Sequence, residues 1–342
     1  MGVQIADIVP RKEIQLSDLK GKIVAIDAFN AIYQFLTTIR QPDGTPLMDH
    51  NKKITSHLSG LFYRNINLLL EGIKPVYVFD GKPSEMKFKE IARRTELKKQ
   101  AEEKYEEAKS EGDEESMRKY SQQFVKVTPE ILQQSKDLLD ALGIPVIQAK
   151  GEGEAEASFL TKNNKAWAAA SQDYDALLFG AKYLVRNLTL ARKRKTSAGA
   201  YVEVNPEIIE FQSLLNHLQI DKDQLICLGI LVGTDFNPGG IKGIGQKTAL
   251  EIVRKYQYPV KIFEYLENSD KYRDKINFNW QDVFKEFHEY ACCENPELKF
   301  KKPNPDKVRE ILLEHDFSIE RINSGLQKLE DAAEKGKQKT LF

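Results

Sequence analysis

Aspartates end the apolar runs of the chain, and they are the residues best suited to carry out chemistry. The runs are K-I-V-A-I-D (22–27), P-V-Y-V-F-D (75–80) and A-W-A-A-A-S-Q-D-Y-D (166–175). Their aspartates are Asp27, Asp80, Asp173 and Asp175. Short apolar runs predict buried strands, and ligands bind beyond the carboxyl ends of parallel strands. The spacing of two predicts that Asp173 and Asp175 share one face of an extended segment. We therefore expect the four carboxylates to meet at one edge of a sheet.

A second acidic stretch, G-E-G-E-A-E-A-S at 151–158, carries Glu152, Glu154 and Glu156. It follows I-P-V-I-Q at 144–148, which predicts another strand, so it lies at the same sheet edge. One alternative is an ordinary helix start, because the first turn of a helix attracts negative charge. Asp235 adds a further carboxylate, just after the apolar helix expected at 223–233.

Clustered carboxylates repel one another and raise their pKa values unless a cation neutralises them. A single Asp-x-Asp pair is weak evidence, but carboxylates at four strand ends favour a hard cation such as Mg²⁺, which takes oxygen ligands. The five histidines are scattered, which disfavours zinc. Two Mg²⁺ ions would activate water and stabilise the leaving oxygen of a phosphodiester. No G-x-x-x-x-G-K-[ST] loop is present, so the pattern indicates nucleic acid rather than nucleotides.

A glycine-rich stretch, G-G-I-K-G-I-G-Q-K-T-A at 239–249, separates two apolar helical segments. Gly243 and Gly245 let backbone N–H groups approach a phosphate at a helix start, and Lys242 and Lys247 add positive charge. This is typical of a helix–hairpin–helix that binds DNA without reading its sequence. The alternative is an ordinary helix-capping loop. The basic run at 192–195 is either a further backbone contact or a solvated loop.

The segment 82–126 is polar on all sides. Residues 82–99 carry seven basic and three acidic side chains, a net of +4, whereas residues 102–115 carry two basic and eight acidic ones, a net of −6. The usual interpretation is a solvated helix or a linker. The more specific interpretation is a helical insertion whose basic half faces a polyanion.

The whole chain predicts an α/β fold with a mostly parallel central sheet flanked by helices, including helices at 51–70, 129–142 and 154–163. With 51 basic and 51 acidic residues the net charge is zero, so only local charge indicates partners. Three cysteines give no disulfide framework and fit a reducing compartment. No signal peptide or membrane span is seen, which predicts a cytoplasmic protein without membrane contact.

Several blocks of the sequence together resemble the flap endonucleases, structure-specific 5′ nucleases of replication and repair, and most closely the archaeal type. The blocks are M-G-V-Q-I (1–5), I-D-A-F-N-A-I-Y-Q-F-L (26–36), V-F-D-G-K-P (78–83), E-A-E-A-S (154–158), S-Q-D-Y-D (171–175) and L-V-G-T-D-F-N (231–237). The resemblance implies a buried N-terminus beside the active site and two Mg²⁺ ions. It also implies seven metal-site carboxylates: Asp27, Asp80, Glu154, Glu156, Asp173, Asp175 and Asp235. Glu152 falls outside this set and is interpreted as a helix-start or surface carboxylate.

The resemblance gives the insertion at 82–126 the role of a helical arch through which a single-stranded 5′ flap passes. Lys87 and Arg94 would face the scissile phosphate. Tyr33 would stack on a base, although a core tyrosine on an apolar helix is the alternative. The expected duplex-binding residues, with a potassium ion, are Gly239, Gly240, Lys242, Gly243, Gly245, Lys247 and Thr248. The tail carries half of a sliding-clamp motif: Gln338, Leu341 and Phe342.

The expected division of the chain is a nuclease core at 1–220 with its arch insertion, a helix–hairpin–helix region at 221–322, and a flexible tail at 323–342. The predicted function is Mg²⁺-dependent cleavage at the base of 5′ flaps, with 5′–3′ exonuclease activity, by a monomer acting on branched DNA. A catalytically inactive binder of DNA junctions is the competing hypothesis. A metal-dependent phosphatase of small molecules is a third, which the hairpin and the basic arch disfavour.

Overall fold

A mixed β-sheet forms the centre of the computed structural model, which describes residues 2–41, 44–190, 193–195, 201–293 and 296–339. Over these residues the sheet has seven strands in the order β1-β9-β6-β5-β2-β3-β4. Their bounds are β1 (Lys12–Glu13), β2 (Ile23–Asp27), β3 (Lys74–Phe79), β4 (Val146–Gln148), β5 (Ala168–Ala170), β6 (Tyr183–Arg186) and β9 (Glu207–Glu210). The five central strands β6-β5-β2-β3-β4 are parallel, and β9 and β1 complete one edge with antiparallel pairing. The predicted mostly parallel sheet is confirmed.

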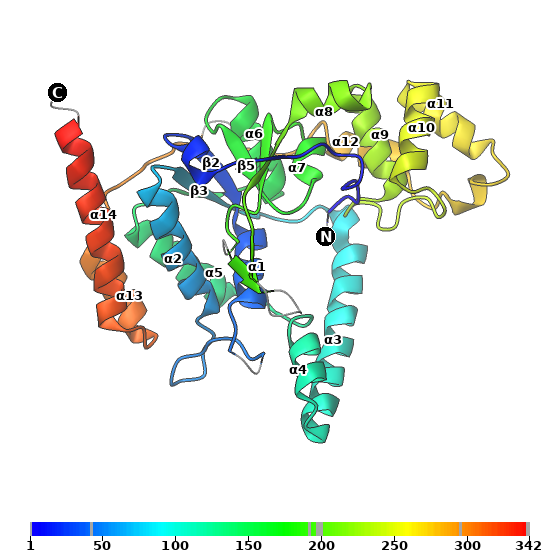
Figure 1. The fold of residues 1–342 in the computed structure, drawn as a ribbon. Helices are drawn as coiled ribbons and strands as arrows, with labels where there is room; N and C mark the ends of the chain where they lie inside the picture. Colours follow the sequence, from blue (N-terminus) through cyan, green and yellow to red (C-terminus); the bar gives the residue numbers. More distant parts are fainter. Residues whose placement is uncertain (1, 42–43, 191–192, 196–200, 294–295, 340–342) are drawn as a thin grey trace.

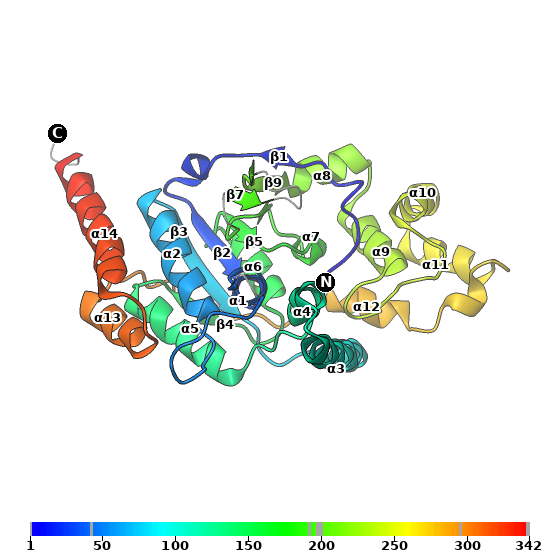
Figure 2. The same ribbon diagram turned by 60° about the horizontal axis from the view of Figure 1, so that its bottom comes forward.

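Helices cover both faces of this sheet, because alternate side chains of each strand point to opposite sides. On one face lie α1 (Ala28–Thr38), α2 (Ser56–Leu70), α5 (Pro129–Ala141), α13 (Pro305–Glu314) and α14 (Ile319–Lys339). On the other lie α6 (Gly153–Lys162), α7 (Asp175–Leu178), α8 (Phe211–Leu218) and α9 (Lys222–Val232). Each face has its own buried core, so the sheet is fixed from both sides and its carboxyl-terminal edge is rigid (Figures 1 and 2).

Two local expectations about element ends were wrong. The strand expected at 166–175 ends at Ala170, because the Asp173 N–H binds the Ser171 hydroxyl at 3.2 Å and turns the chain. Asp175 therefore begins α7 rather than continuing an extended segment. The helix expected from residue 51 starts at Ser56, since the Asp49 carboxylate accepts the N–H groups of residues 51 and 53 and holds a turn before it.

The helix predicted at 129–142 is confirmed, together with its signals. The Thr128 hydroxyl accepts the Ile131 N–H at 3.2 Å, and Pro129 occupies the first helical position. Gly143 follows the end of α5 with a φ of +73°, the left-handed conformation that favours glycine. The adjacent strand β4 thus leaves for the sheet edge in a defined direction.

The acidic and basic insertion is a helical hairpin that projects from the sheet (Figure 1). It consists of α3 (Phe88–Glu111) and α4 (Glu114–Ser121), preceded by the short 3₁₀ turn η2 (Glu85–Lys87). Gly112 has a φ of +71° and Asp113 caps α4, so the turn between the helices is encoded locally. The Ser121 hydroxyl donates to the Gly44 carbonyl at 3.0 Å. The far limb of the hairpin is therefore tied back to the loop after α1.

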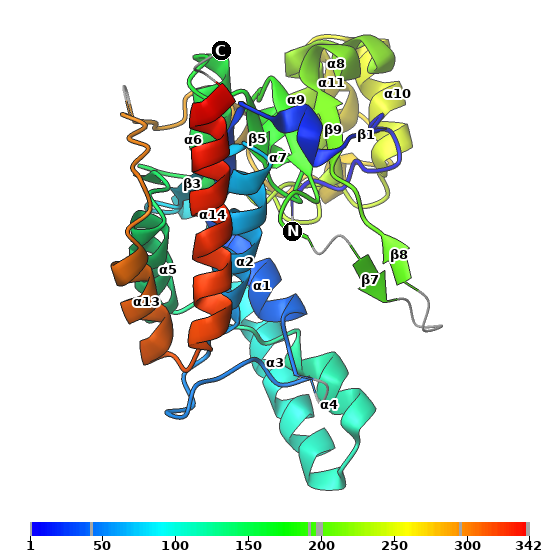
Figure 3. The same ribbon diagram turned by 60° about the vertical axis from the view of Figure 1, so that its left-hand side comes forward.

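The remaining helices lie beyond α9, on the side of the sheet away from α14: α10 (Gln246–Tyr256), α11 (Pro259–Glu267) and α12 (Trp280–Glu286), with the 3₁₀ turn η3 (Arg273–Lys275). A short 3₁₀ turn, η1 (Leu16–Leu19), precedes β2. A small antiparallel hairpin, β7 (Lys193–Lys195) and β8 (Tyr201–Glu203), extends from the main sheet (Figure 3). In the part of the chain described here, no helix has the length and apolarity that a membrane span needs.

The expected boundary at residue 322 and the flexible tail after it were wrong for residues 323–339. These residues continue α14, which packs along α2 with Ile322 and Leu326 buried. A side chain at Gly325 would lie 2.9 Å from the Phe62 ring, so this glycine permits close helix contact. The apolar spacing of Ile322, Leu326 and Leu329 at positions three and four apart is the helical signal behind this packing. Helices α13 and α14 thus belong to the layer beside the sheet and not to the region of α9–α12.

Candidate metal centre and nucleic-acid interface

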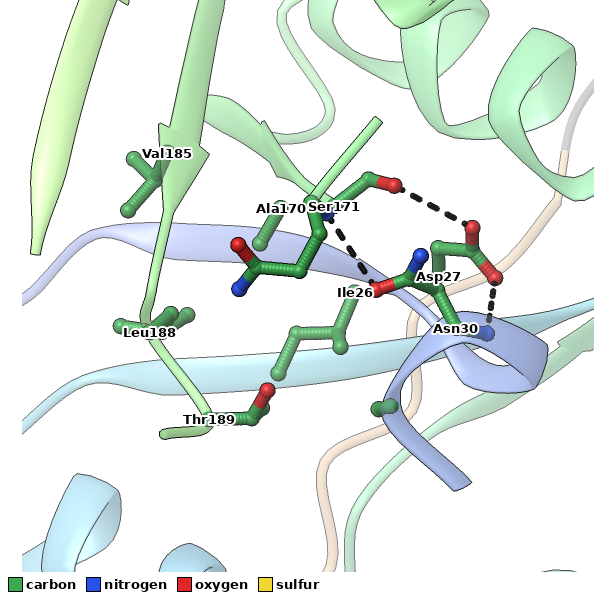
Figure 4. A pocket seen from close by; sticks show the side chains of 10 residues that line it. Ile26, Asp27, Asn30, Ala170, Ser171, Val185, Leu188 and Thr189 are labelled. Atoms are coloured by element: carbon green, nitrogen blue, oxygen red, sulfur yellow. Dashed lines mark hydrogen bonds between the residues drawn. The ribbon is translucent and has the colours of Figure 1, made fainter. Parts of the chain in front are cut away.

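Carboxylates from three strand ends meet beyond the carboxyl edge of the sheet. Asp27 ends β2 and caps α1, where its Oδ1 accepts the Asn30 N–H at 3.0 Å. The Ser171 hydroxyl, after β5, lies 3.4 Å from Asp27 Oδ2 (Figure 4). The same hydroxyl lies 3.0 Å from Glu154 Oε1. Glu154 stands in the first turn of α6, where the helix dipole favours its charge. One hydroxyl thus joins acidic groups from two elements far apart in the sequence.

The Asn30 side chain joins a third carboxylate to this group. Its amide N–H donates to Asp173 Oδ2 at 3.2 Å. Its Oδ1 accepts the Gln172 N–H at 3.2 Å (Figure 4). Asp80, at the end of β3, accepts the N–H of Gly153 at 2.6 Å. That bond brings the start of α6 against the end of β3. We expected this, because both segments follow strands at the same edge of the sheet.

The N-terminal segment closes one side of the cluster. The Gly2 N–H donates to Asp173 Oδ1 at 3.0 Å, and the Val3 N–H donates to Asp175 Oδ1 at 3.1 Å. A Cβ at Gly2 would lie 2.0 Å from Asp175 Oδ2, so only glycine fits there. The expected buried N-terminus beside the carboxylates is confirmed for residues 2–5, of which Gln4 alone is exposed.

Two cations of the arch lie over the acidic cluster. Lys87 Nζ pairs with Glu152 Oε2 at 2.5 Å and with Asp235 Oδ2 at 3.7 Å. Arg94 Nη2 donates to Asp235 Oδ1 at 2.6 Å. Lys87 lies in η2, just before the helix that carries Arg94, yet both side chains reach the same aspartate. Asp235 therefore joins the predicted site through these cations.

Glu156, which was expected among the metal-site carboxylates, does not lie at the cluster, whereas Glu152, which was not expected there, does. The Glu156 carboxylate turns away, where its Oε2 accepts the Cys293 N–H at 2.9 Å. Helical residues two apart point about 200° apart, so Glu154 and Glu156 cannot share a face once α6 has begun. Glu152 precedes the helix and pairs with Lys87. The sequence predicted a helix at 154–163, and the pair Glu154 and Glu156 followed from the family resemblance, whereas the structure starts α6 at Gly153 and places Glu152 and Glu154 toward the strand ends.

Burial and mutual repulsion shift the acid–base properties of the cluster. Burial, together with the charges of Asp80 and Asp173, raises the pKa of Asp27 to about 8. Burial and the charges of Asp173 and Asp235 raise the pKa of Asp175 to about 7. The pKa of Glu154 and that of Asp80 are also raised, in both cases chiefly by burial. A cation bound among these groups would relieve both causes.

The donor set fits a hard divalent cation. All the groups are carboxylate oxygens, and Glu152 Oε1 is buried without a hydrogen-bond partner among the described residues. Within that same part of the chain, no three His, Cys, Asp or Glu side chains already converge as a preformed coordination sphere. Mg²⁺ does not need one, because it keeps several waters and binds through few carboxylates.

Tyr33 lies half-buried on α1, facing the arch rather than the centre of the core. The Nζ of Lys98 lies 5.6 Å from the centre of its ring. The alternative of a core tyrosine is therefore only half correct, because one part of the ring packs and the other remains accessible beside a basic helix.

The glycine-rich stretch is a hairpin between α9 and α10. Gly239, Gly240 and Gly243 all have positive φ, between 55° and 93°, and a Cβ at Gly240 would lie 2.4 Å from the Leu231 carbonyl. The buried Ile241 anchors the loop by donating its N–H to that same carbonyl at 2.9 Å. The hairpin exposes Lys242, Gly243, Gly245 and Lys247, and it half-exposes Thr248. Gly245 caps α10, so the helix start faces outward, as phosphate binding requires.

The predicted clamp-binding residues are only partly described. Gln338 lies in α14, whereas Leu341 and Phe342 lie outside the described residues, as does Arg192 of the basic run.

Comparisons with known proteins agree with this arrangement. The XPG N-terminal domain matches residues 1–101, and the XPG I-region matches residues 143–235. Flap endonuclease 1 of Hyperthermus butylicus is 51% identical over 97% of this chain and 95% of the relative, and that of Pyrococcus furiosus is 51% identical over 100% and 98%. The solved flap endonuclease-1 from Methanococcus jannaschii has 40% identity and a TM-score of 0.76, covering 98% of this chain and all of that one.

The chain belongs to the flap endonuclease 1 family.

Family membership also groups the candidate residues. The first matched region holds Asp27 and Asp80 with the arch cations Lys87 and Arg94, and the second ends at Asp235. The outer half of the arch hairpin lies between the two matched regions. The candidate carboxylates and the two arch cations thus lie in the matched parts, whereas the outer arch and the hairpin at 239–248 lie outside them.

The raised pKa values predict how metal-free protein responds to pH. A carboxylate whose pKa is raised on folding stabilises the fold below its unfolded pKa, and this contribution is lost as pH rises through the folded value. For Asp175 and Asp27 the loss is complete near pH 7 and 8. With chelator, the melting temperature is expected to fall by several degrees between pH 5.5 and 8.5, and Mg²⁺ is expected to restore it at pH 8.5.

Thermal melts of Asp27→Asn test the cause, because asparagine cannot ionise and should flatten the pH dependence. Asp274→Asn, whose side chain is 86% exposed, is the control and should keep the wild-type slope. An unchanged slope in Asp27→Asn would show that this carboxyl does not carry the effect.

Proposed function

We propose that this chain is a structure-specific nuclease that hydrolyses phosphodiester bonds at the base of 5′ flaps in branched DNA, with 5′–3′ exonuclease activity, in Okazaki fragment maturation and DNA repair. The observation that carries the proposal is the carboxylate cluster, with Asp27 and Asp175 buried and with Lys87 and Arg94 held directly over it. A protein that only bound DNA would gain nothing from buried acids that repel phosphates. Its relatives at 51% identity bear the name flap endonuclease 1.

The carboxylates are proposed to hold two Mg²⁺ ions. The set is Asp27, Asp80, Glu152, Glu154, Asp173, Asp175 and Asp235, with Glu152 in place of Glu156. When bound, such ions supply an activated water and stabilise the leaving oxygen of the phosphodiester. The backbone N–H groups of Gly2 and Val3 orient Asp173 and Asp175, and Ser171 and Asn30 orient Asp27 and its neighbours.

Lys87 and Arg94 are proposed to bind the scissile phosphate and stabilise the charge that builds on its oxygens. Their carboxylate partners, Glu152 and Asp235, are also proposed metal ligands. Each cation therefore has an anionic partner with and without substrate. With Glu152 and Asp235 engaged as metal ligands, the scissile phosphate would become the partner of Lys87 and Arg94, so these side chains would remain paired and close to their present positions.

The DNA-binding surfaces flank this centre. The hairpin at 239–248 is proposed to bind the duplex backbone through its exposed N–H groups and lysines, with a potassium ion held by backbone carbonyls and the Thr248 hydroxyl. Tyr33 is proposed to stack on a base, a contact worth ~1–3 kcal/mol. The 5′ strand would pass through the arch at 82–126. Because these contacts are with phosphates, affinity should fall steeply with salt.

We further propose that the protein works as a cytoplasmic, nucleoid-associated monomer. In this division of labour, residues 1–220 provide the nuclease, α9–α12 provide duplex binding, and α13–α14 support the nuclease layer. The tail is proposed to bind a sliding clamp through Gln338, Leu341 and Phe342.

Cleavage of an end-labelled double-flap DNA tests the function directly. With Mg²⁺ we expect cutting at the base of the 5′ flap and little cutting of single-stranded or plain duplex DNA, and with chelator we expect none. Binding without cutting in any divalent metal would contradict the proposal and support the inactive junction binder. Equal cutting of all substrates would contradict structure specificity.

Paired substitutions test which glutamates hold the metal. Glu152→Gln removes a charge from the cluster and is expected to slow single-turnover cleavage at least ~100-fold, with flap binding largely retained. Glu156→Gln removes a carboxyl that faces Cys293 and should stay within a few-fold of wild type. The opposite ranking would restore the assignment made from the sequence.

Removal of residues 338–342 tests the tail. Cleavage by the isolated protein should be unchanged, because Gln338 and Lys339 end α14 on the side of the molecule away from the arch, while stimulation by a sliding clamp should fall (Figure 1). Lys337→Ala, which leaves the motif intact, is the control. Unchanged stimulation after the deletion would remove the tail from the clamp interface.

A further inference from the structure

Glu90 is a buried acid on a helix that is otherwise almost entirely solvated. Only Glu90, Ala101 and Ala108 are buried among the 24 residues of α3, and the Glu90 side chain is 5% exposed. A buried carboxylate needs partners to offset its lost hydration. Glu90 has two, and both are neighbouring arginines of its own helix.

The two arginines use Glu90 differently. Arg93 binds it through Nε at 2.7 Å and Nη2 at 2.8 Å, a bidentate pair in which the carboxylate takes one whole edge of the guanidinium. Arg94 donates its Nε to Glu90 Oε1 at 2.7 Å, while its Nη2 reaches Asp235 at 2.6 Å. Glu90 thus holds the stem side of the Arg94 guanidinium while the tip reaches the carboxylate cluster.

Glu90 and Asp235, which both accept hydrogen bonds from Arg94, lie in different parts of the fold. Glu90 precedes Arg94 by four residues on the same helix, so this bond moves with the arch when the arch moves. Asp235 follows α9 in a different part of the fold and is a proposed metal ligand. A phosphate that replaces Asp235 would leave the Glu90 bond in place. The contact to Glu90 would then hold Arg94 to its own helix after the contact to Asp235 has been replaced.

We propose that Glu90 is a positioning residue for cleavage, which fixes the Arg94 guanidinium toward the scissile phosphate. Glu90 also keeps the neighbouring Arg93 paired through a bidentate contact. The proposal rests on the proposed function, since it assigns Arg94 a role at that phosphate. An arginine side chain on an exposed helix otherwise samples many rotamers, and a misplacement of about 1 Å can cost ~100-fold in rate. Glu90 does not touch the substrate.

The alternative role of Glu90 is purely structural, because an acid in the first turn also stabilises a helix through its dipole. That role would not depend on Arg94. A double-mutant cycle separates the two roles. The variants are Glu90→Ala, Arg94→Ala and both together, measured by single-turnover cleavage of the double-flap DNA and by equilibrium binding of the same DNA in Ca²⁺.

We expect Glu90→Ala to slow the single-turnover rate about 10–100-fold while the dissociation constant for flap DNA changes less than ~3-fold. In the Arg94→Ala background the same substitution should change the rate less than ~2-fold, because the group that it positions is gone. Glu90→Gln keeps one acceptor oxygen and should recover part of the loss. Glu96→Ala is the matched control, since Glu96 is an exposed residue of α3 that accepts a bond from Gln100.

Equal slowing by Glu90→Ala with and without Arg94 would overturn the proposal and assign Glu90 to arch structure. A wild-type rate for Glu90→Ala would overturn it as well. Wild-type enzyme reports separately on the proposed function: if it fails to cut the double flap, that function is wrong, whereas a cutting wild type with an additive cycle refutes only the role of Glu90.

Discussion

Repulsion among buried carboxylates is the constraint on which the rest of this structure depends. Acidic groups from three strand ends and one helix start share one site, in which Asp27 and Asp175 are buried, and burial together with the charges of neighbouring carboxylates raises the pKa values of Asp27 and Glu154. A fold tolerates this only where rigid elements hold the groups in place. The two cores on either face of the sheet provide that rigidity. Backbone N–H groups of the N-terminal segment and the arch cations then offset part of the charge.

The same repulsion explains why the arch begins where it does. Lys87 and Arg94 are the counter-ions nearest to Asp235 and Glu152, so the base of α3 is fixed to the sheet by charge rather than by apolar packing. Farther out, few of the described side chains of α3 are buried, and the Ser121 hydroxyl ties the hairpin to the loop at Gly44. Stability along the arch therefore decreases away from the chemistry, as expected of an element that must admit a strand.

Much of this site could be predicted from the sequence, because strand exits are marked by short apolar runs that end in aspartate. Asp27 and Asp80 followed from that signal alone. The pair Glu154 and Glu156 came from the family resemblance, and the structure places Glu152 rather than Glu156 beside the cluster, because residues two apart on α6 point to opposite sides. The helical structure of residues 323–339 was not predicted for a different reason. Polar residues surround a narrow apolar stripe, and the role of this stripe becomes clear only from its packing against α2.

Helix α14 also determines how the nuclease can be tethered. A flexible tail would let a partner bound near Gln338 sample a wide volume, whereas a helix rises ~1.5 Å per residue and keeps its direction. With 21 residues, α14 is a spacer of about 30 Å, fixed along α2 through Leu326. A sliding clamp bound near Gln338 would therefore be joined to a helix that packs on the nuclease layer, and not to a freely moving segment.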